Sequence, residues 1–305
     1  MVNPAKLEPV RRDAVCAQCH LSGEARIETA GRRIEDYRPS DLLSDFVGYF
    51  VFEDRRSALK ATSHVEKLSA SRCKQRSGDK VWCGSCHDPH GEPVADNREG
   101  WYRARCESCH NKQQCRRGPA CASCHMPKAT AVDGVHGVLT DHSIPRRATR
   151  VGFAQAVAWK LIPFSGVTPP DRDLGLAYAE VFLRSGDKRQ ASQAICLLDR
   201  GDLDPPAMVL LADLYQRLGT TDKALLLYRK MLEAEPDNYL VLANLATLVA
   251  SRGAVKEAVP LWRRALTLSP CSEGIAVNLT TALRALGELA EAAAYERSQA
   301  LCRFQ

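Results

Sequence analysis

Four copies of one short cysteine and histidine pattern constrain this chain more than any other feature. Each copy has two cysteines separated by two residues and then a histidine, at residues 16–20, 83–87, 106–110 and 121–125. Two thiols three positions apart lie on one turn of chain, so both can add to the vinyl groups of one haem while the histidine meets the iron. We therefore predict four covalently bound c-type haems. The attaching cysteines are Cys16, Cys19, Cys83, Cys86, Cys106, Cys109, Cys121 and Cys124. The proximal iron ligands are His20, His87, His110 and His125.

A structural zinc site or an iron–sulfur cluster is the competing interpretation, because paired C-x-x-C units also bind those metals. Neither site requires a histidine directly after the second cysteine, and here all four copies have one. The spacing therefore favours haem.

The remaining histidines equal the predicted haems in number. The chain has eight histidines, and those not assigned as proximal ligands are His64, His90, His136 and His142. We predict that they are the distal ligands, which gives each iron two imidazoles and a lower reduction potential than methionine–histidine ligation. Met126 competes for one site at most, since it directly follows His125. The pairing of distal histidines with haems stays open.

The formal net charge of +6 lies wholly in the first 150 residues, which have 25 Lys and Arg against 19 Asp and Glu, whereas the rest has 17 of each. The negatively charged propionates of the predicted haems would offset this positive charge, because the net charge of a protein includes that of its cofactors. We therefore expect no nucleic-acid partner. The guanidinium group of arginine forms paired hydrogen bonds with a carboxylate. The candidate propionate partners are Arg103, Arg105, Arg116 and Arg117. The longest apolar runs, such as residues 47–52, are too short to span a membrane.

The haem-bearing half has few apolar side chains to pack. Between residues 96 and 125 the apolar side chains other than cysteine are Trp101, Tyr102, Ala104, Ala120 and Ala122. So small a set does not offset the loss of chain entropy on folding. We predict a loop-rich domain over residues 1–150 that packs around its haems and is largely unfolded without them. The residues expected to form a wall over a haem are Phe46, Tyr49, Phe50 and Phe52.

The second half follows a 34-residue period after a predicted linker at residues 151–171. The predicted units are residues 172–204, 205–238, 239–272 and 273–305, with small residues, a glycine and a proline at matching offsets. Small residues let two helices pack closely, the glycine permits the turn between them, and the proline ends the second helix. This half looks like a tetratricopeptide-repeat α-solenoid. Such arrays expose a concave surface that binds a peptide or another protein.

Five cysteines lie outside the four motifs. A disulfide between Cys73 and Cys115 is compatible with an oxidising compartment, and the sequence leaves that pairing open. We expect Cys196, Cys271 and Cys302, all in the helical half, to be small buried hydrophobic residues.

The whole chain resembles multihaem cytochromes c fused to tetratricopeptide repeats, and its first half resembles the tetrahaem electron carriers of nitrifying bacteria. Residues 121–142, with Cys-His-Met-Pro followed by spaced histidines, carry the most specific part of this likeness. The resemblance implies a mainly α protein of the bacterial periplasm or exterior. Haem is attached after export, yet residues 1–15 contain no apolar signal region, so we expect a segment upstream of residue 1.

The leading functional hypothesis is an electron carrier without bond chemistry of its own, which passes electrons between redox partner proteins. The first alternative is a haem oxidoreductase acting on a small nitrogen or sulfur compound at one iron with an open position. The second alternative is a scaffold subunit of a larger redox complex or filament, in which the repeats bind a partner or a second copy of the chain.

Overall fold

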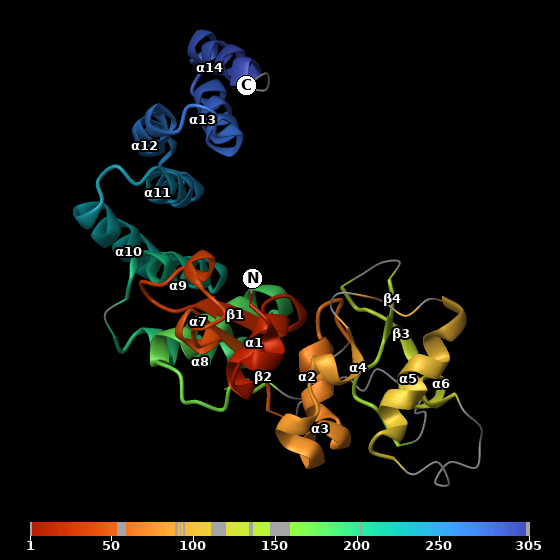
Figure 1. Cartoon of the computed structure of the whole chain (residues 1–305). Helices are drawn as coiled ribbons and strands as arrows, with labels where there is room; N and C mark the ends of the chain where they lie inside the picture. The colour runs from red at the N-terminus through yellow and green to blue at the C-terminus, as the bar shows by residue number, and fades with distance from the viewer. Residues whose placement is uncertain are drawn as a thin grey trace. The chain divides into compact units, whose positions relative to one another are not determined.

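The computed structural model describes residues 2–53, 59–88, 91, 93, 95–110, 120–133, 137–146, 159–201 and 203–302. The chain forms two compact units, Met1–Gln190 and Ala191–Gln305 (Figure 1). Within the described residues, no helix is both long enough and apolar enough to span a bilayer.

A three-stranded antiparallel sheet organises the first unit. Its strands are β1 (Ala25–Glu28), β2 (Val47–Phe52) and β5 (Leu161–Pro163), in the order β1-β2-β5. The central strand β2 aligns Phe50 with Ala25 on one side and with Pro163 on the other. Phe50 is fully buried, as expected for the middle of a sheet rich in aromatic and β-branched residues.

Strand β5 comes from the segment predicted as a linker, so that segment contributes to the first unit. Helix α7 (Asp171–Ser185) packs against the same sheet, and the Tyr178 hydroxyl accepts a hydrogen bond from the Leu161 amide at 3.0 Å. The boundary between units therefore falls after Gln190, whereas the repeat period placed it after residue 171. The difference arises because the apolar face of α7 is buried on the sheet.

The predicted aromatic wall belongs to a polypeptide core. Phe46 and Tyr49 pack with Tyr37 and with residues of α1 (Pro9–His20), including Ala14 and Ala17. The rings of Tyr37 and Phe46 meet edge to face at 5.7 Å between centroids. The expectation that these aromatic side chains cover a haem is therefore wrong for Phe46 and Phe50, which are buried among protein atoms.

The motifs at residues 83–87, 106–110 and 121–125 lie on or at the end of three helices with little apolar packing of their own, α4 (Cys83–Cys86), α5 (Arg98–Glu107) and α6 (Cys121–His125). The neighbouring elements are α2 (His64–Ala70), α3 (Arg72–Ser77) and the hairpin of β3 (Lys128–Thr130) with β4 (Val138–Thr140). Single 3-10 turns occur at Pro4–Lys6, Ile34–Asp36, Leu43–Asp45, Gly78–Lys80 and Ala95–Asn97. Helices α4, α5 and α6 contain no fully buried residue among those described. The scarcity of apolar side chains in the sequence is thus matched by a scarcity of polypeptide core.

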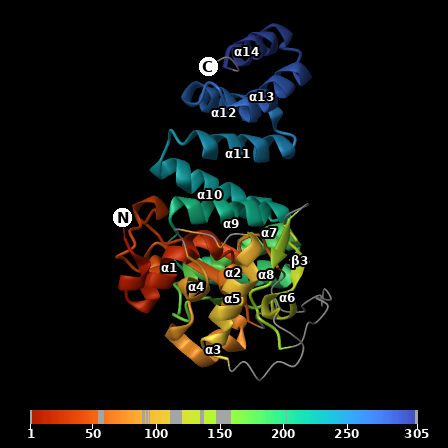
Figure 2. The same cartoon turned by 45° about the vertical axis from the view of Figure 1, so that its right-hand side comes forward.

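The second half consists of helical hairpins. The helices after α7 are α8 (Lys188–Leu198), α9 (Pro205–Arg217), α10 (Thr221–Ala234), α11 (Tyr239–Ser251), α12 (Val255–Leu268), α13 (Glu273–Ala285) and α14 (Leu289–Cys302). From α9 to α14, each helix packs against the next (Figure 2). A helical-repeat architecture is therefore confirmed for this part of the chain.

Glycine and alanine at repeated positions explain the hairpin geometry. Gly219, Gly253 and Gly287 occupy the turns with φ of 77°, 88° and 84°, a left-handed conformation that disfavours residues with a Cβ. Ala224, Ala258 and Ala292 lie in the first turn of the second helix of their hairpins and are 0% exposed. The absence of a larger side chain lets the paired helices approach closely.

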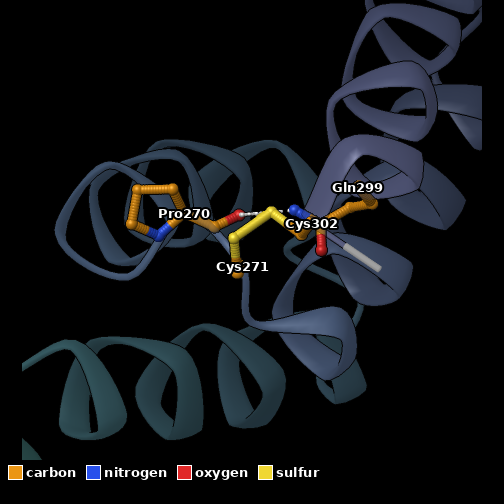
Figure 3. The surroundings of a disulfide bond; sticks show 4 residues. All are labelled: Pro270, Cys271, Gln299 and Cys302. Carbon is orange, nitrogen blue, oxygen red and sulfur yellow. Dashed lines mark hydrogen bonds between the residues drawn. A yellow bond between two sulfur atoms is a disulfide. The ribbon is translucent and has the colours of Figure 1, made fainter. Parts of the chain in front are cut away.

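A disulfide joins Cys271 to Cys302, with 5.4 Å between their Cα atoms (Figure 3). Cys271 precedes α13 and Cys302 ends α14, so the hairpin brings the two ends together. The Gln299 amide donates a hydrogen bond to the Pro270 carbonyl beside this bond. The expectation that Cys196, Cys271 and Cys302 are small buried residues is wrong: Cys271 and Cys302 form the disulfide, and Cys196 is exposed. Cys73 is half-buried and free, and Cys115 lies outside the described residues.

Candidate functional site

Each predicted attachment motif forms about one turn of helix. The His87 amide donates to the Cys83 carbonyl at 2.9 Å, and the His110 amide donates to the Cys106 carbonyl at 2.9 Å. Positions three and four apart share one face of a helix, so both thiols and the imidazole of a motif lie on the same side. The motif at residues 16–20 ends α1, and that at residues 121–125 forms α6. This is the local geometry that thioether attachment requires.

Four histidines from separate segments meet in the first unit. His20 ends α1, His64 begins α2, His87 follows α4, and His142 follows β4. The ring centroids of His20 and His64 are 5.2 Å apart, those of His64 and His142 are 4.7 Å apart, and those of His87 and His142 are 6.1 Å apart. We call these four residues the histidine cluster. It combines two predicted proximal ligands with two predicted distal ligands.

Burial favours the neutral imidazole at two members of the cluster, His64 and His142. Burial lowers the pKa of His64 to about 4, and the neighbouring histidines His142, His20 and His87 lower it further in that order. Burial also lowers the pKa of His142. A neutral imidazole keeps the nitrogen lone pair that metal ligation uses. The His64 Nδ1 atom is buried and has no hydrogen-bond partner within the described part of the chain.

Two predicted iron ligands have one ring nitrogen anchored by the backbone. The His142 Nδ1 lies 2.9 Å from the Thr140 carbonyl oxygen, and the His125 Nδ1 lies 2.9 Å from the Pro145 carbonyl oxygen. When Nδ1–H donates to a carbonyl, the lone pair is on Nε2, and metal-ligating histidines commonly show this arrangement. These contacts fix the orientation of both imidazoles and leave Nε2 as the nitrogen with an available lone pair.

The first two motifs touch through their cysteines. A hydrogen bond between the Cys16 and Cys83 thiols lowers the pKa of Cys16 to about 7 and raises that of Cys83. Beside this contact, the Arg12 guanidinium stacks on Trp82 at 4.8 Å from the ring centroid. Thus α1 and α4 hold the motifs at residues 16–20 and 83–87 next to each other.

Helix α5 connects the second and third motifs. In the first half of α5 the Trp101 indole donates to the Cys86 carbonyl at 3.3 Å, and the Tyr102 ring meets the His87 ring at 5.7 Å between centroids. At its other end α5 contains Cys106. Sequence reasoning did not assign Trp101 or Tyr102 to the site, although their closeness to a motif along the chain was a usable signal.

The predicted propionate partners have different surroundings. Arg103 pairs with Glu107 at 2.7 Å, and Arg105 stacks on Trp101 at 4.4 Å from the ring centroid. Arg116 and Arg117 lie outside the described residues. The contacts of Arg103 and Arg105 are thus with protein side chains, and the assignment of either to a propionate stays a prediction.

Other predicted ligands stand apart from the cluster or fall outside the described chain. His110 is exposed on its motif, and His125 is half-buried by the turn at Pro145. His90 and His136 lie outside the described residues. Over the ranges that the structure describes, no three His, Cys, Asp or Glu side chains are arranged to hold a metal ion without a cofactor.

Comparisons with known proteins concern the helical repeats. Residues 206–283 match the family described as the TT21 fifth ARM repeats domain. Solved structures of MamA are similar to this chain. MamA AMB-1 is 20% identical, covers 45% of this chain and 84% of its own, and has a TM-score of 0.37. A further crystal structure of MamA is 14% identical, covers 44% of this chain and 80% of its own, and has a TM-score of 0.39. No curated protein matches the chain.

Proposed function

We propose that the first unit is a multihaem c-type cytochrome that carries electrons between redox partner proteins. The observation that carries this proposal is the histidine cluster, in which His20 and His87 from two attachment motifs meet His64 and His142. Bound haem would supply a one-electron couple between ferric and ferrous iron.

The residues present fit covalent haem. Each motif presents two thiols and an imidazole on one face, and the buried His64 Nδ1 has no partner among the described atoms. Helices α4, α5 and α6 have no buried side chain of their own, as expected where a large apolar cofactor provides the packing. His20 and His87 would each hold the iron of their own motif's haem, and His64 and His142 would supply the second imidazole of these two irons.

The protein's own groups have defined tasks in this proposal. The Thr140 carbonyl orients His142 through Nδ1, and Trp101 holds the backbone at Cys86. Burial keeps His64 and His142 uncharged, so both imidazoles are ready to ligate without first losing a proton. Two neutral imidazoles per iron would block small-molecule binding, which is the property of a carrier.

The disulfide supports an oxidising location. Disulfides persist in the periplasm and outside the cell, and Cys271–Cys302 is such a bond. Attachment of c-type haem also follows export, so two sets of cysteines with separate chemistry agree. We propose the periplasm or the cell exterior as the location of this protein, and the disulfide is consistent with that proposal.

A second candidate function is assembly of a redox complex through the repeats. Two helices per 34-residue unit is the tetratricopeptide pattern, and such arrays bind proteins on a concave surface. Leu240 on α11 and Val277 on α13 are 56% and 55% exposed, which gives the repeats apolar side chains for a partner. Native mass measurement of the haem-loaded chain tests this function, since a monodisperse monomer that recruits no redox partner contradicts it.

The test of the main proposal is the haem content and ferric spectrum of the whole chain exported by a bacterium that matures cytochromes c. We expect covalent haem in a ratio of four per chain, with low-spin absorption bands. A chain without covalent haem would overturn the proposal. A high-spin band in the wild-type protein would instead favour the oxidoreductase with an open iron position.

A further inference from the structure

A buried carboxylate connects the first attachment motif to the helix of His64. Glu66 lies two residues after His64 on α2, and it is only 7% exposed. Its Oε1 atom accepts hydrogen bonds from the Ser22 amide at 2.9 Å and from the Gly23 amide at 2.5 Å. Both amides belong to the chain that directly follows His20 and the end of α1. One carboxylate oxygen therefore connects the segments that present His20 and His64.

Lys60, which precedes His64 in the sequence, binds the same turn after His20. The Lys60 ammonium donates to the Gly23 carbonyl at 2.5 Å and pairs with Glu24 at 2.8 Å. The two charged side chains of that pair are 18% and 13% exposed, so water screens the pair less than a surface pair. Ser22, Gly23 and Glu24 are thus held by residues on either side of His64.

The chain can be held this closely only because residue 23 is glycine. Gly23 has φ of 65°, and a Cβ at this position would lie 2.8 Å from the Phe50 carbonyl oxygen. The backbone is therefore pressed against strand β2 on one side while Glu66 binds its amide. The turn after His20 has little freedom to shift relative to α2.

The second oxygen of Glu66 argues against a role in stability alone. Oε2 is buried and has no hydrogen-bond partner within the described residues. Buried polar atoms without partners are rare in folded proteins and costly. The cost of burying Oε2 is explained if the Glu66 carboxylate is needed to fix the backbone position of Ser22 and Gly23.

We infer that Glu66 is a positioning residue that sets the separation of His20 and His64 by holding the turn after His20 against α2. The inference rests on the proposed function, because it assigns those histidines to iron. Glu66 acts through the backbone amides of Ser22 and Gly23 and contacts neither imidazole in this role.

The decisive experiment compares Glu66→Ala with Glu66→Gln in the exported, haem-loaded whole chain. In Glu66→Ala we expect four covalent haems, because attachment uses cysteines, but a high-spin ferric signal from about a quarter of the iron. Glu66→Gln keeps an oxygen that can accept both amide hydrogens, so it should keep the low-spin spectrum. A general loss of stability would not affect one iron selectively or be rescued by glutamine.

The matched control is Glu53→Ala, which removes a 2.8 Å ion pair with Lys160 at an exposed edge of the same unit. It should leave every iron low-spin. The inference is overturned if Glu66→Ala keeps the wild-type spectrum, or if Glu66→Gln loses low-spin iron as alanine does. Absence of haem from the wild-type chain would instead overturn the proposed function, and this inference with it.

Hydrogen exchange of the wild-type chain keeps the test independent of whether Glu66→Ala folds. The Ser22 and Gly23 amides should exchange slowly in the wild-type protein and in Glu66→Gln. Fast exchange of both amides in the wild-type protein would overturn the inference, since the carboxylate would then not hold the turn.

Discussion

The imidazole of His64 lies edge-on to that of His142, with 4.7 Å between ring centroids and an angle of 84° between ring planes. Neither residue belongs to an attachment motif, and they come from different elements, α2 and the turn after β4. Both lie beside motif histidines, since His64 contacts His20 and His142 contacts His87. This contact is the reason that we propose His64 and His142 as distal iron ligands.

Replacing Cys83 and Cys86 together with alanine should remove one covalent haem from the chain. Thioether bonds need the thiols, and the other three motifs keep theirs. Intact mass and haem absorbance of the purified protein measure the change. Cys196→Ala is the control, because this thiol is exposed and outside the motifs, and it should keep full haem content. Equal haem content in the double variant and the wild-type chain would contradict haem attachment at this motif.

Replacing His64 with alanine should convert about a quarter of the iron from low-spin to high-spin, because one iron loses an imidazole. Ferric absorption and electron paramagnetic resonance measure the fraction. Ser69→Ala on the same helix is the control, since it removes only a hydroxyl that donates to the Glu66 carbonyl. A fully low-spin His64→Ala protein would show that His64 is not an iron ligand.

Removing the Cys271–Cys302 disulfide should destabilise the repeats by about 3–4 kcal/mol, because the crosslink closes a loop of 31 residues in the unfolded chain. Thermal unfolding of Cys271→Ala, followed by circular dichroism, measures the loss. Reductant should lower the midpoint of the wild-type protein and leave that of the variant unchanged. If reductant leaves the wild-type midpoint unchanged, the bond does not stabilise the native chain.

Replacing Gly253 with alanine should destabilise the repeats by about 1–2 kcal/mol, because the turn needs φ of 88° and a Cβ disfavours that conformation. Gly274→Ala is the matched control within α13, where an added Cβ meets no atom and φ is not positive. It should leave stability unchanged or raise it by up to about 1 kcal/mol. Denaturant unfolding compares the two variants, and equal losses would contradict the role of the turn.

The repeats were the part of the fold that sequence predicted best. The helix pairs from α9 to α14 begin and end close to the predicted 34-residue units, because the turn glycines and helix-packing alanines act through contacts with near neighbours. The sheet in the first unit was not predicted. Strand β5 is three residues long and contains a proline, so it has no alternating pattern that a sequence could reveal.

The motif spacing predicts a set of site residues and says nothing of how they are arranged. Because thioether attachment needs positions three and four apart on one turn, the cysteines and the histidine of each motif are predicted to act together. No local pattern identifies Glu66, which contacts Ser22 and Gly23 across a long stretch of chain. The same holds for Cys271 and Cys302, whose spacing of 31 residues carries no local sign of a disulfide.

The sequence by itself determined the four attachment motifs, the excess of histidines over proximal ligands and the helical period, because each is encoded by spacing within one turn or one repeat. Only the tertiary structure decided that His20, His64, His87 and His142 meet, that α7 is buried on the sheet, and that Cys271 pairs with Cys302. The physical reason is that these contacts join residues distant in the chain. Their formation depends on how whole elements pack, and the spacing of residues within each element does not specify it.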